Sequence, residues 1–433
     1  MKYISSKSLR KISLENYGFF LFLCGIFILP SSLFLSILLL LPAALIGTLS
    51  NKKPYLQDKW NYPFISFGIL ILISSLLQKF VFHNVYHEIW DSNLSLIGLG
   101  NWLPFIWLFW AFQPYVNTSA KRKSFALVLI SSTFPVLITG FGQYFFNWTG
   151  PFQTLNGFIV WYQRPIKNPA GLSGLFNNQN YAGSWLNFVW PFCIAILLEK
   201  GNNFFKKAAS FSFLVSVGFA AFLTFSRNAW LGIIISTPII LGKRFIKLIF
   251  PVLAFILFIV FIQIFSLDIT NQIGSFLSEK FFQELTAEGY KELDVTRLDI
   301  FSSAISFIKI NPIFGIGAAS FSALYLLETN LWKGHSHNLL LELAISYGIP
   351  STILLFTIIN TIIFKSGKIL FSINNESKIA FSDRAFWTAL IFFLISQISD
   401  IQYFDGKISL IAWILMAGLK NIIEGNNTQL SKR

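Results

Sequence analysis

Residues 33–49 read LFLSILLLLPAALIGTL and contain no charged side chain. Polar residues and two positive charges follow directly, in Asn51-Lys52-Lys53. A helix that crosses a bilayer needs about 20 mainly apolar residues, and somewhat fewer suffice when flanking side chains reach the headgroups. The stretch therefore predicts a transmembrane helix, and the lysines indicate that its C-terminal end faces the cytoplasm.

Apolar stretches of this kind recur along the whole chain. Together they predict an all-α fold, a polytopic transmembrane helical bundle of about 12 spans. The predicted spans are 17–30, 33–49, 62–78, 101–116, 125–146, 182–198, 209–225, 229–242, 248–266, 338–364, 385–399 and 408–421. Charged residues make up only 12% of the 433 positions, against 54% hydrophobic residues, and the mean hydropathy is +0.62. A soluble globule carries roughly a quarter charged residues, so lipid must cover much of this surface.

The distribution of Lys and Arg predicts the orientation of the chain. If both termini are cytoplasmic, seven cytoplasmic segments hold 23 of the 33 basic residues. This asymmetry follows the positive-inside rule. The net charge of +14 would suit a nucleic-acid partner only if the basic residues gathered along one face, and they do not. We therefore expect a multi-pass protein of the cell inner membrane, with both termini cytoplasmic, in contact with membrane lipid and not with nucleic acid.

The N-terminal region is basic and precedes an apolar run from Gly18 to Leu29, as in a signal peptide. No small-residue cleavage site follows the run, so an uncleaved first helix is the better interpretation. Two cysteines, Cys24 and Cys193, lie in apolar stretches and offer no disulfide or metal framework.

The chain is expected to form a single integral membrane domain, residues 1–433, with three long outer segments at 79–100, 147–181 and 267–337. The last is the large periplasmic loop and the natural place for a functional element. It holds 8 acidic and 5 basic residues, so an arginine that works there is an individual feature and not part of a basic patch.

Residues 297–310 within this loop have helical periodicity. Their apolar side chains share one face: Leu298, Phe301, Ile305 and Ile308. Thr296 can cap the start of the helix, and Asn311-Pro312 ends it. We therefore predict an amphipathic helix that lies on the outer membrane surface.

Three arginines, Arg164, Arg227 and Arg297, are not explained by the positive-inside pattern. Arg227 lies between two apolar runs, where it either reaches the lipid headgroups or forms an anion site, since charge near a span usually serves function. Arg297 begins the predicted amphipathic helix, where its charge opposes the helix dipole. It either pairs with Asp294 or Asp299 or binds an anion. A planar guanidinium suits bidentate contact with phosphate oxygens.

All four histidines are predicted outside: His83, His87, His335 and His337. His335-Ser336-His337-Asn338 lies where the large loop re-enters the membrane, and a histidine there can act as a general base because its reference pKa is about 6.5. The alternatives are a hydrogen-bonded interfacial histidine and a metal site, although no cysteine or nearby acid completes a metal site. His83 and His87 have an i, i+4 spacing that could hold a metal, but their order is not His-Glu-x-x-His.

The motifs of soluble nucleotide-dependent and hydrolytic enzymes are missing from the sequence. It has no Walker loop, no Gly-x-Ser-x-Gly motif and no Rossmann fingerprint, so nucleotide-driven work would need a partner. The first outer loop, Pro30-Ser31-Ser32, carries no acid, which argues against the metal-dependent glycosyltransferases of the multi-span type.

Four segments resemble, in their order and outer positions, those of O-antigen ligase and polymerase-like membrane proteins. They are Gly174-Leu-Phe-Asn-Asn-Gln-Asn-Tyr181, Ser226-Arg227-Asn-Ala-Trp-Leu231, Arg297 through Gly315-Ile-Gly317, and His335-Ser-His337-Asn338 followed by Gly348-Ile-Pro350. The resemblance covers residues 170–350 by motif and the remainder by hydropathy. Ser351 stands where glycine is common and Gln179 where proline is usual. The motifs therefore identify the superfamily better than the subfamily or the substrate.

The resemblance implies a GT-C-like glycosyltransferase that needs no cofactor and no metal. Its donor would be a glycan on undecaprenyl diphosphate, and its acceptor the lipid A core or another glycan, in lipopolysaccharide or polysaccharide biosynthesis. Arg227 and Arg297 would bind the diphosphate, and His337 would be the catalytic base at the periplasmic face. Secondary candidates for orienting the base or binding substrates are His335, Asn338, Arg164, Asn177 and Asn180.

Three other interpretations remain open at this point, and one of them is a structural membrane partner without activity, in which Arg227, Arg297 and His337 would be replaceable. A polymerase of the same family would extend a glycan on its carrier lipid. A transporter, of lipid-linked glycans or of an anion such as bicarbonate, would also fit the hydropathy, but transporters often show inverted repeats with charges near mid-membrane. Here the charges gather at the outer boundary and the chain has no internal repeat, which favours an enzyme.

Overall fold

The computed structural model describes residues 6–82, 89–161, 163–166, 171–199, 201, 203–242, 245, 296–372 and 380–430. Within them the chain is predominantly helical, and two short strands, β1 (Phe152–Thr154) and β2 (Ile159–Trp161), pair antiparallel. The predicted helical class is confirmed, and several of the helices are long and apolar enough to cross a membrane.

The helices follow the predicted apolar stretches. In chain order they are α1 (Ser6–Ile28), α2 (Leu33–Ser50), α3 (Asn61–Phe80), α4 (Asn93–Gly98), α5 (Leu103–Ala111), α6 (Ser119–Ser132), α7 (Phe134–Phe146), α8 (Gln179–Leu197), α9 (Phe204–Leu223), α10 (Arg227–Leu241), α14 (Arg297–Ile310), α15 (Ser320–Thr329), α16 (Leu339–Tyr347), α17 (Ile349–Leu370), α18 (Phe381–Ser396) and α19 (Gly406–Leu430). Short 3-10 turns are η1 (Tyr55–Gln57), η3 (Leu99–Asn101), η4 (Gln113–Tyr115) and η5 (Leu155–Gly157).

Seven helical segments among the described residues are long and apolar enough to cross a membrane. They are Leu33–Ser50, Asn61–Phe80, Asn93–Ala111, Ser119–Phe146, Phe204–Leu223, Ile349–Leu370 and Gly406–Asn426. The total of about 12 spans stays a prediction, because some helices fall short of this length and the predicted span 248–266 lies outside the described residues. Residues 267–295 of the predicted periplasmic loop and the histidine pair His83 and His87 also lie outside them.

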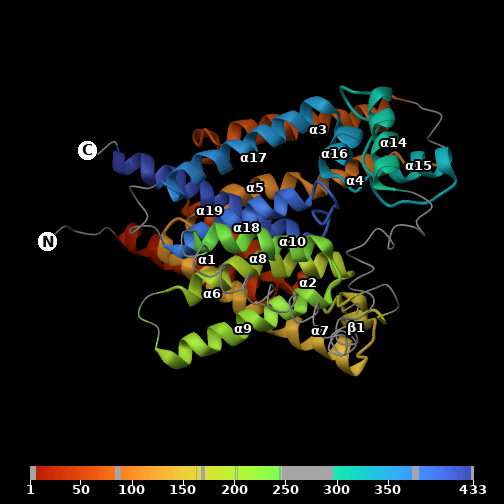
Figure 1. The fold of residues 1–433 in the computed structure, drawn as a ribbon. Helices are drawn as coiled ribbons and strands as arrows, with labels where there is room; N and C mark the ends of the chain where they lie inside the picture. The colour runs from red at the N-terminus through yellow and green to blue at the C-terminus, as the bar shows by residue number, and fades with distance from the viewer. Residues whose placement is uncertain are drawn as a thin grey trace, which may run out of the picture.

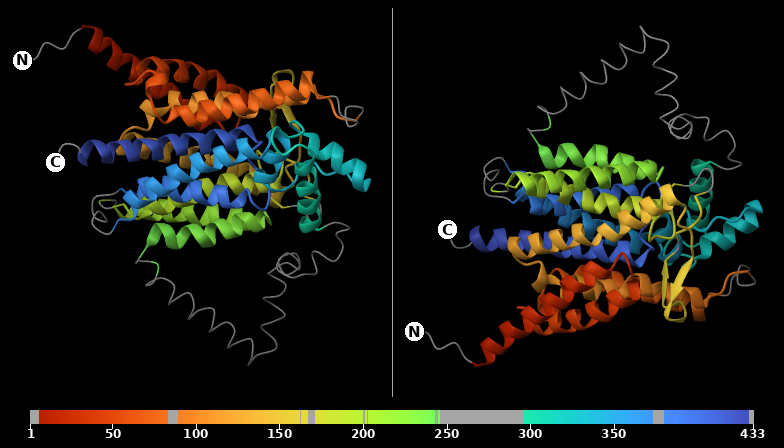
Figure 2. Two further views of the ribbon diagram at one scale, coloured as in Figure 1. Left: turned by 90° about the horizontal axis from the view of Figure 1, so that it is seen from above. Right: turned by 90° about the horizontal axis from the view of Figure 1, so that it is seen from below.

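The long helices run side by side in one bundle (Figure 1). α1 begins and α19 ends at the same end, which we call the terminal end (Figures 1 and 2). α14 and α15 lie at the opposite end, the α14 end, where α14 runs across the direction of the long helices (Figure 2). The start of α1 and the end of α19 therefore lie at the end opposite to α14 and α15, the described helices of the predicted periplasmic loop (Figures 1 and 2).

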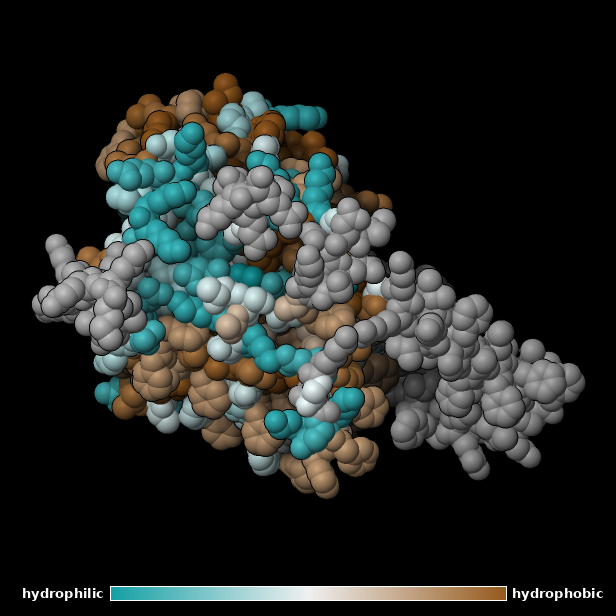
Figure 3. Space-filling view, turned by 90° about the vertical axis from the view of Figure 1, so that its left-hand side faces the viewer, coloured by the Kyte–Doolittle hydropathy of each residue, from teal (hydrophilic) through white to brown (hydrophobic). Residues whose placement is uncertain are grey.

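The terminal end has a polar surface, and buried ion pairs join its helices. Hydrophilic residues gather across it, with apolar residues at its flanks (Figure 3). Arg122 of α6 makes two contacts with Asp383 of α18, at 2.7 and 2.8 Å. Lys420 of α19 contacts Asp58, which follows η1, at 2.7 Å. Removing one partner of a buried pair leaves an uncompensated charge, so these contacts favour one arrangement of the helices.

The predicted span 338–364 consists of two helices, α16 and α17, that meet at Gly348. Gly348 has a φ of +86°, and a Cβ atom there would lie 2.0 Å from the carbonyl oxygen of Ile313. The turn after α14 occupies this break, and the N–H of Ile349 donates to the carbonyl of Pro312 at 2.8 Å. The glycine thus serves a helix break that hydropathy alone did not predict.

α14 has the bounds predicted for the amphipathic helix. Thr296 and Asp299 form a capping box, in which each accepts a hydrogen bond from the backbone N–H of the other. The helix packs on α15 and α16 with three buried residues outside the predicted apolar face: Ile300, Ala304 and Phe307. Leu298 of the predicted face is 77% exposed, and its contact with the membrane surface stays a prediction.

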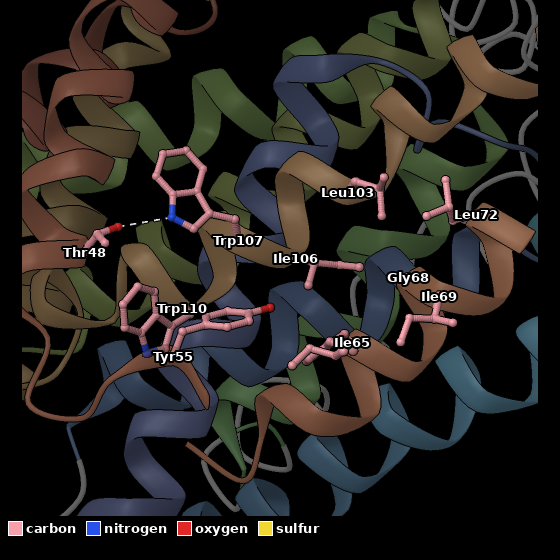
Figure 4. Close-up of a pocket in the computed structure, with 11 residues that line it drawn as sticks. Thr48, Tyr55, Ile65, Gly68, Ile69, Leu72, Leu103, Ile106, Trp107 and Trp110 are labelled. Carbon is pink, nitrogen blue, oxygen red and sulfur yellow. Dashed lines mark hydrogen bonds between the residues drawn. The ribbon is translucent and has the colours of Figure 1, made fainter. Parts of the chain in front are cut away.

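A cavity of about 550 Å³ lies between α2, α3 and α5 (Figure 4). Its walls are mainly apolar, and the indole Nε1 of Trp107 donates to the hydroxyl of Thr48 at 3.1 Å within it. None of the residues proposed from the sequence lines this cavity.

Candidate active site at the α14 end

Asn338 connects two segments that are far apart in the sequence. Its side-chain oxygen accepts from the N–H groups of Leu340 and Leu341 at 3.0 and 3.1 Å, which caps the start of α16. Its side-chain nitrogen donates to the carbonyl of Ile398, just after α18, at 3.0 Å. Asn338 therefore holds the His335–Asn338 turn against the connection between α18 and α19.

His337 has an unusual backbone conformation that its neighbours support. Its φ is +54°, in the left-handed region that non-glycine residues seldom adopt. Its N–H donates to Nδ1 of His335 at 3.1 Å. The preceding N–H, of Ser336, donates to the buried carboxyl group of Glu342 at 2.9 Å. Such conformations persist where surrounding contacts fix them, and they are common at functional sites.

Asp400 is the partner of His337. Nδ1 of His337 lies 2.8 Å from Oδ1 of Asp400, and the side chains are 29% and 8% exposed. Asn180, near the start of α8, donates to the other carboxylate oxygen at 2.8 Å. Because an ionised carboxylate can only accept, Nδ1 of His337 carries the hydrogen and Nε2 is left to accept a proton.

The surroundings keep Asp400 ionised. Burial raises the pKa of this carboxyl, but the hydrogen bond from His337 and the charges of His337, His335 and Arg297 outweigh burial and lower the pKa below its usual range. An ionised Asp400 stabilises positive charge on His337 when the ring takes up a proton. The pair therefore has the arrangement of a general base with an orienting acid.

His335 is held in its neutral form beside this pair. Its ring centroid lies 4.5 Å from that of His337, edge to face. Burial, and then the neighbouring His337, lower the pKa of His335 from 6.5 to about 4. Since its Nδ1 accepts the His337 N–H, its hydrogen sits on Nε2.

His335 should make the stability of the protein depend on pH. With a pKa of about 4 in the folded chain against 6.5 in the unfolded chain, its contribution is complete above pH 6.5 and is lost as the pH falls toward 4. Over this range the thermal unfolding midpoint should fall more in wild type than in His335→Asn, which keeps an acceptor but does not titrate. Equal slopes in the two proteins would contradict the assignment.

The two arginines begin helices at this site. Arg227 is the first residue of α10 and is half-buried, and the side chain of its neighbour Asn228 accepts from the hydroxyl of Ser399 at 2.9 Å. Arg297 is the first residue of α14, is exposed, and makes no ion pair with Asp299 or another described residue. Asp294, the other predicted partner, lies outside the described residues.

Three helices direct their N-terminal ends to the segment around Asp400. The side chain of Asn180 in α8 donates a hydrogen bond to Asp400. The side chain of Asn228 in α10 accepts one from the adjacent Ser399. The side chain of Asn338, at the start of α16, donates one to the carbonyl of Ile398. The helix dipole makes each such end favourable for an anion. With the arginines, this end of the bundle provides positive potential around a single acid–base pair.

The remaining predicted residues lie at the same loops with less definite roles. The side chain of Arg164 is exposed, and its carbonyl accepts from the side chain of Gln143 at 2.7 Å. Asn177 precedes the cap of α8, and its buried Oδ1 atom has no hydrogen-bond partner among the described residues. The structure thus connects Asn180 directly to the acid–base pair, and it gives no such bond for Asn177.

Residues 211–356 match the family model described as O-antigen ligase. Over this segment, about a third of the chain, the protein is similar to O-antigen ligases. Arg227, Arg297 and the His335–Asn338 turn lie inside the matched segment, whereas Asn180 and Asp400 lie outside it. A comparison with curated proteins finds no match.

Sequence reasoning missed Asp400. Asp400 stands 63 positions after His337, directly after the predicted span 385–399. An acid at the outer end of a span is a usable signal, since charge there is seldom placed without a partner. Nothing in the sequence pairs it with His337, because helix packing brings the two loops together.

The structure also corrects the argument from sequence against a metal site at His335 and His337. His335, His337 and Asp400 place one possible ligand atom each within 4.8 Å of one another, so an acid does complete a three-group cluster. The Nδ1 atoms of both histidines are already engaged, one with Asp400 and one with a backbone N–H. A metal on these atoms would have to break the hydrogen bonds that hold the turn.

Proposed function

We propose that this protein transfers a glycan from undecaprenyl diphosphate to an acceptor hydroxyl, as a membrane glycosyltransferase of the O-antigen ligase type. The hydrogen bond between His337 and Asp400 carries the proposal, since it prepares a general base among the starts of three helices. The family match supports an enzyme acting on a lipid-linked glycan and a glycan acceptor in general terms.

His337 activates the acceptor in this mechanism. Its Nε2 removes the proton from the acceptor hydroxyl while the oxygen attacks the anomeric carbon of the donor. The bond to the diphosphate oxygen breaks as the new glycosidic bond forms, which inverts the configuration and leaves undecaprenyl diphosphate as the product. Asp400 stabilises the protonated ring and fixes its orientation, while His335 and Asn338 hold the turn.

Arg227 and Arg297 neutralise the leaving group. Negative charge develops on the diphosphate as the anomeric bond breaks, and donors fixed in advance stabilise that charge. The helix starts at α8, α10 and α16 add to the same potential. Two arginines used in this way take the place that a divalent metal has in other glycosyltransferases, so the reaction is metal-independent.

An apolar groove suits the polyprenyl chain of the donor. The groove, of about 260 Å³, lies between α16, α17 and α18 and includes Leu339, Phe356 and Ile398 among its walls. The groove begins beside the site. The side chain of Asn338 donates to the carbonyl of Ile398 there, and the N–H of Leu339 donates to the carbonyl of Gln397. A chain lying there would place its diphosphate next to His337 and Asp400.

The glycolipids of a deletion strain test this function. We expect glycan polymer to accumulate on its carrier lipid, with bare lipid A core, if the protein is the ligase. Single repeat units attached without a ladder would make it a polymerase of the same family. An unchanged pattern, in a strain without a redundant enzyme, would remove both functions and favour a transporter of lipid-linked glycan or a bicarbonate-related anion.

Asp400→Asn should reduce kcat about 10- to 100-fold, the range for losing one hydrogen bond to a charged group. The amide keeps the shape but not the charge that stabilises protonated His337. The loss should not be additive with that of a His337 variant, since both act on one proton transfer. Equal kcat in Asp400→Asn and wild type, measured in purified protein, would exclude the pair as the base.

Treatment with EDTA should leave the transfer rate unchanged within about twofold, because arginines and not a metal stabilise the diphosphate. The measurement compares purified protein before and after chelation, with added Mg²⁺ or Zn²⁺ as the control. Loss of activity that a metal restores would instead assign His335, His337 and Asp400 as ligands.

A further inference from the structure

A second, smaller cavity lies beside the candidate active site. It has a volume of about 210 Å³ and is formed by α4, η3, α16 and the turn before α16. His335 is in its wall, so the cavity and the His337–Asp400 pair share one residue as their boundary. Typical ligand pockets measure about 300–1,000 Å³, and this smaller cavity has room for a single ring.

Glu342 is the unusual residue in this cavity. Its side chain is 4% exposed, and no Lys or Arg among the described residues forms an ion pair with it. The N–H of Ser336, behind the cavity wall, donates to its Oε2 atom at 2.9 Å. A buried carboxyl group without a cation is unfavourable unless hydrogen-bond donors satisfy it. A ligand with hydroxyl groups would supply such donors.

The rest of the wall matches the surface of a sugar. Trp102, Tyr347 and Phe404 present aromatic rings, against which the C–H face of a pyranose can pack. His335 carries its hydrogen on Nε2, because Nδ1 accepts the N–H of His337, and can donate to a sugar oxygen. Asn101 adds an amide that both donates and accepts. A few polar groups among aromatic side chains are the usual composition of a specific small-molecule site.

We propose that this cavity binds the acceptor sugar, with Glu342 accepting hydrogen bonds from hydroxyls next to the one that reacts. This inference rests on the proposed function and assigns its second substrate. The acceptor then reaches His337 from the side of His335, while the donor lies on the side of α8, α10 and the apolar groove. Glu342 would thereby set which acceptor sugar is used.

Steady-state kinetics of the full-length protein in liposomes test the assignment. The donor is a glycan on undecaprenyl diphosphate, and the acceptors are lipid A core and a carrier-linked single repeat unit. Ile97→Trp adds bulk at the cavity rim, where Ile97 is 67% exposed, and should raise the acceptor KM at least tenfold with the donor KM unchanged. Val81→Trp, at a 59% exposed position outside the wall, is the matched control and should leave both unchanged.

The variant Glu342→Gln distinguishes a role of Glu342 in binding the acceptor from a role in positioning His337. Glutamine keeps an oxygen that can accept from Ser336, so the turn is retained while the carboxyl group is lost. We expect the acceptor KM to rise about tenfold, because the amide replaces a carboxyl oxygen that accepts from the sugar with a group that only donates, with kcat largely kept. A fall in kcat alone would mean that Glu342 only positions His337 and would overturn the assignment, as would an unchanged acceptor KM in Ile97→Trp. Wild-type protein that transfers glycan to neither acceptor would instead refute the proposed function itself, and the acceptor site with it.

Discussion

His337→Ala is expected to lower kcat for glycan transfer by about 10²–10⁴-fold, the usual contribution of a positioned general base. The variant removes the only group that the mechanism uses to take the acceptor proton, while Asp400 and the arginines stay in place. The donor KM should change little, since the ring does not bind the diphosphate. The rate of transfer by purified protein, at saturating donor and acceptor, is the quantity to measure.

The control for this prediction is a variant of His335, which lies in the same turn and whose replacement leaves the base His337 intact. His335→Asn keeps an acceptor for the His337 N–H and should retain far more activity than His337→Ala. Both variants must show the thermal midpoint of a folded protein. If His337→Ala keeps more than about a tenth of the wild-type kcat, the general-base role is lost, because it falls below the range for such catalysis.

Arg227→Ala and Arg297→Ala should each lower kcat about 10²–10³-fold, as for removing one donor that stabilises a developing anion. Arg227→Lys and Arg297→Lys keep the charge but lose the planar fork, so they should remain clearly impaired. The informative measurement compares all four variants with wild type at saturating donor.

An exposed cation elsewhere on α14 offers the control for the diphosphate-binding role of Arg227 and Arg297. Lys309 lies in the last turn of α14 and is exposed, so Lys309→Ala should be nearly neutral. Full activity of both Arg227→Lys and Arg297→Lys would contradict bidentate binding and leave only a general electrostatic role. Full activity of both alanine variants would exclude any role of Arg227 and Arg297 in stabilising the diphosphate.

The local features of this fold were largely readable from the sequence. The bounds of α14 follow from its periodicity, from Thr296 and from Asn311-Pro312, because caps and stops act within a few residues. The packed face of α14 was not predicted, since three residues outside the apolar stripe contact α15 and α16. Which side of a helix is buried depends on its neighbours, and periodicity alone did not identify them.

The candidate site was predictable only in part, for the same reason. His337 and both arginines stood out as polar groups at span boundaries, where charge is unfavourable without a role. Asp400 did not stand out, since its role follows from a hydrogen bond to His337, which lies 63 positions earlier in the sequence. Likewise, the sequence around Gly348 is continuously apolar and does not indicate a helix break. The break becomes evident only from the contact with the turn at Pro312.

The most direct test of the account follows the glycan in liposomes that contain only the purified protein, labelled lipid-linked donor and acceptor. The account predicts that label appears on an acceptor hydroxyl, that an equal amount of undecaprenyl diphosphate is released, and that both stop in His337→Ala. Label that stays on its carrier lipid, whether or not it changes leaflet, would contradict glycosyl transfer as the function of this protein.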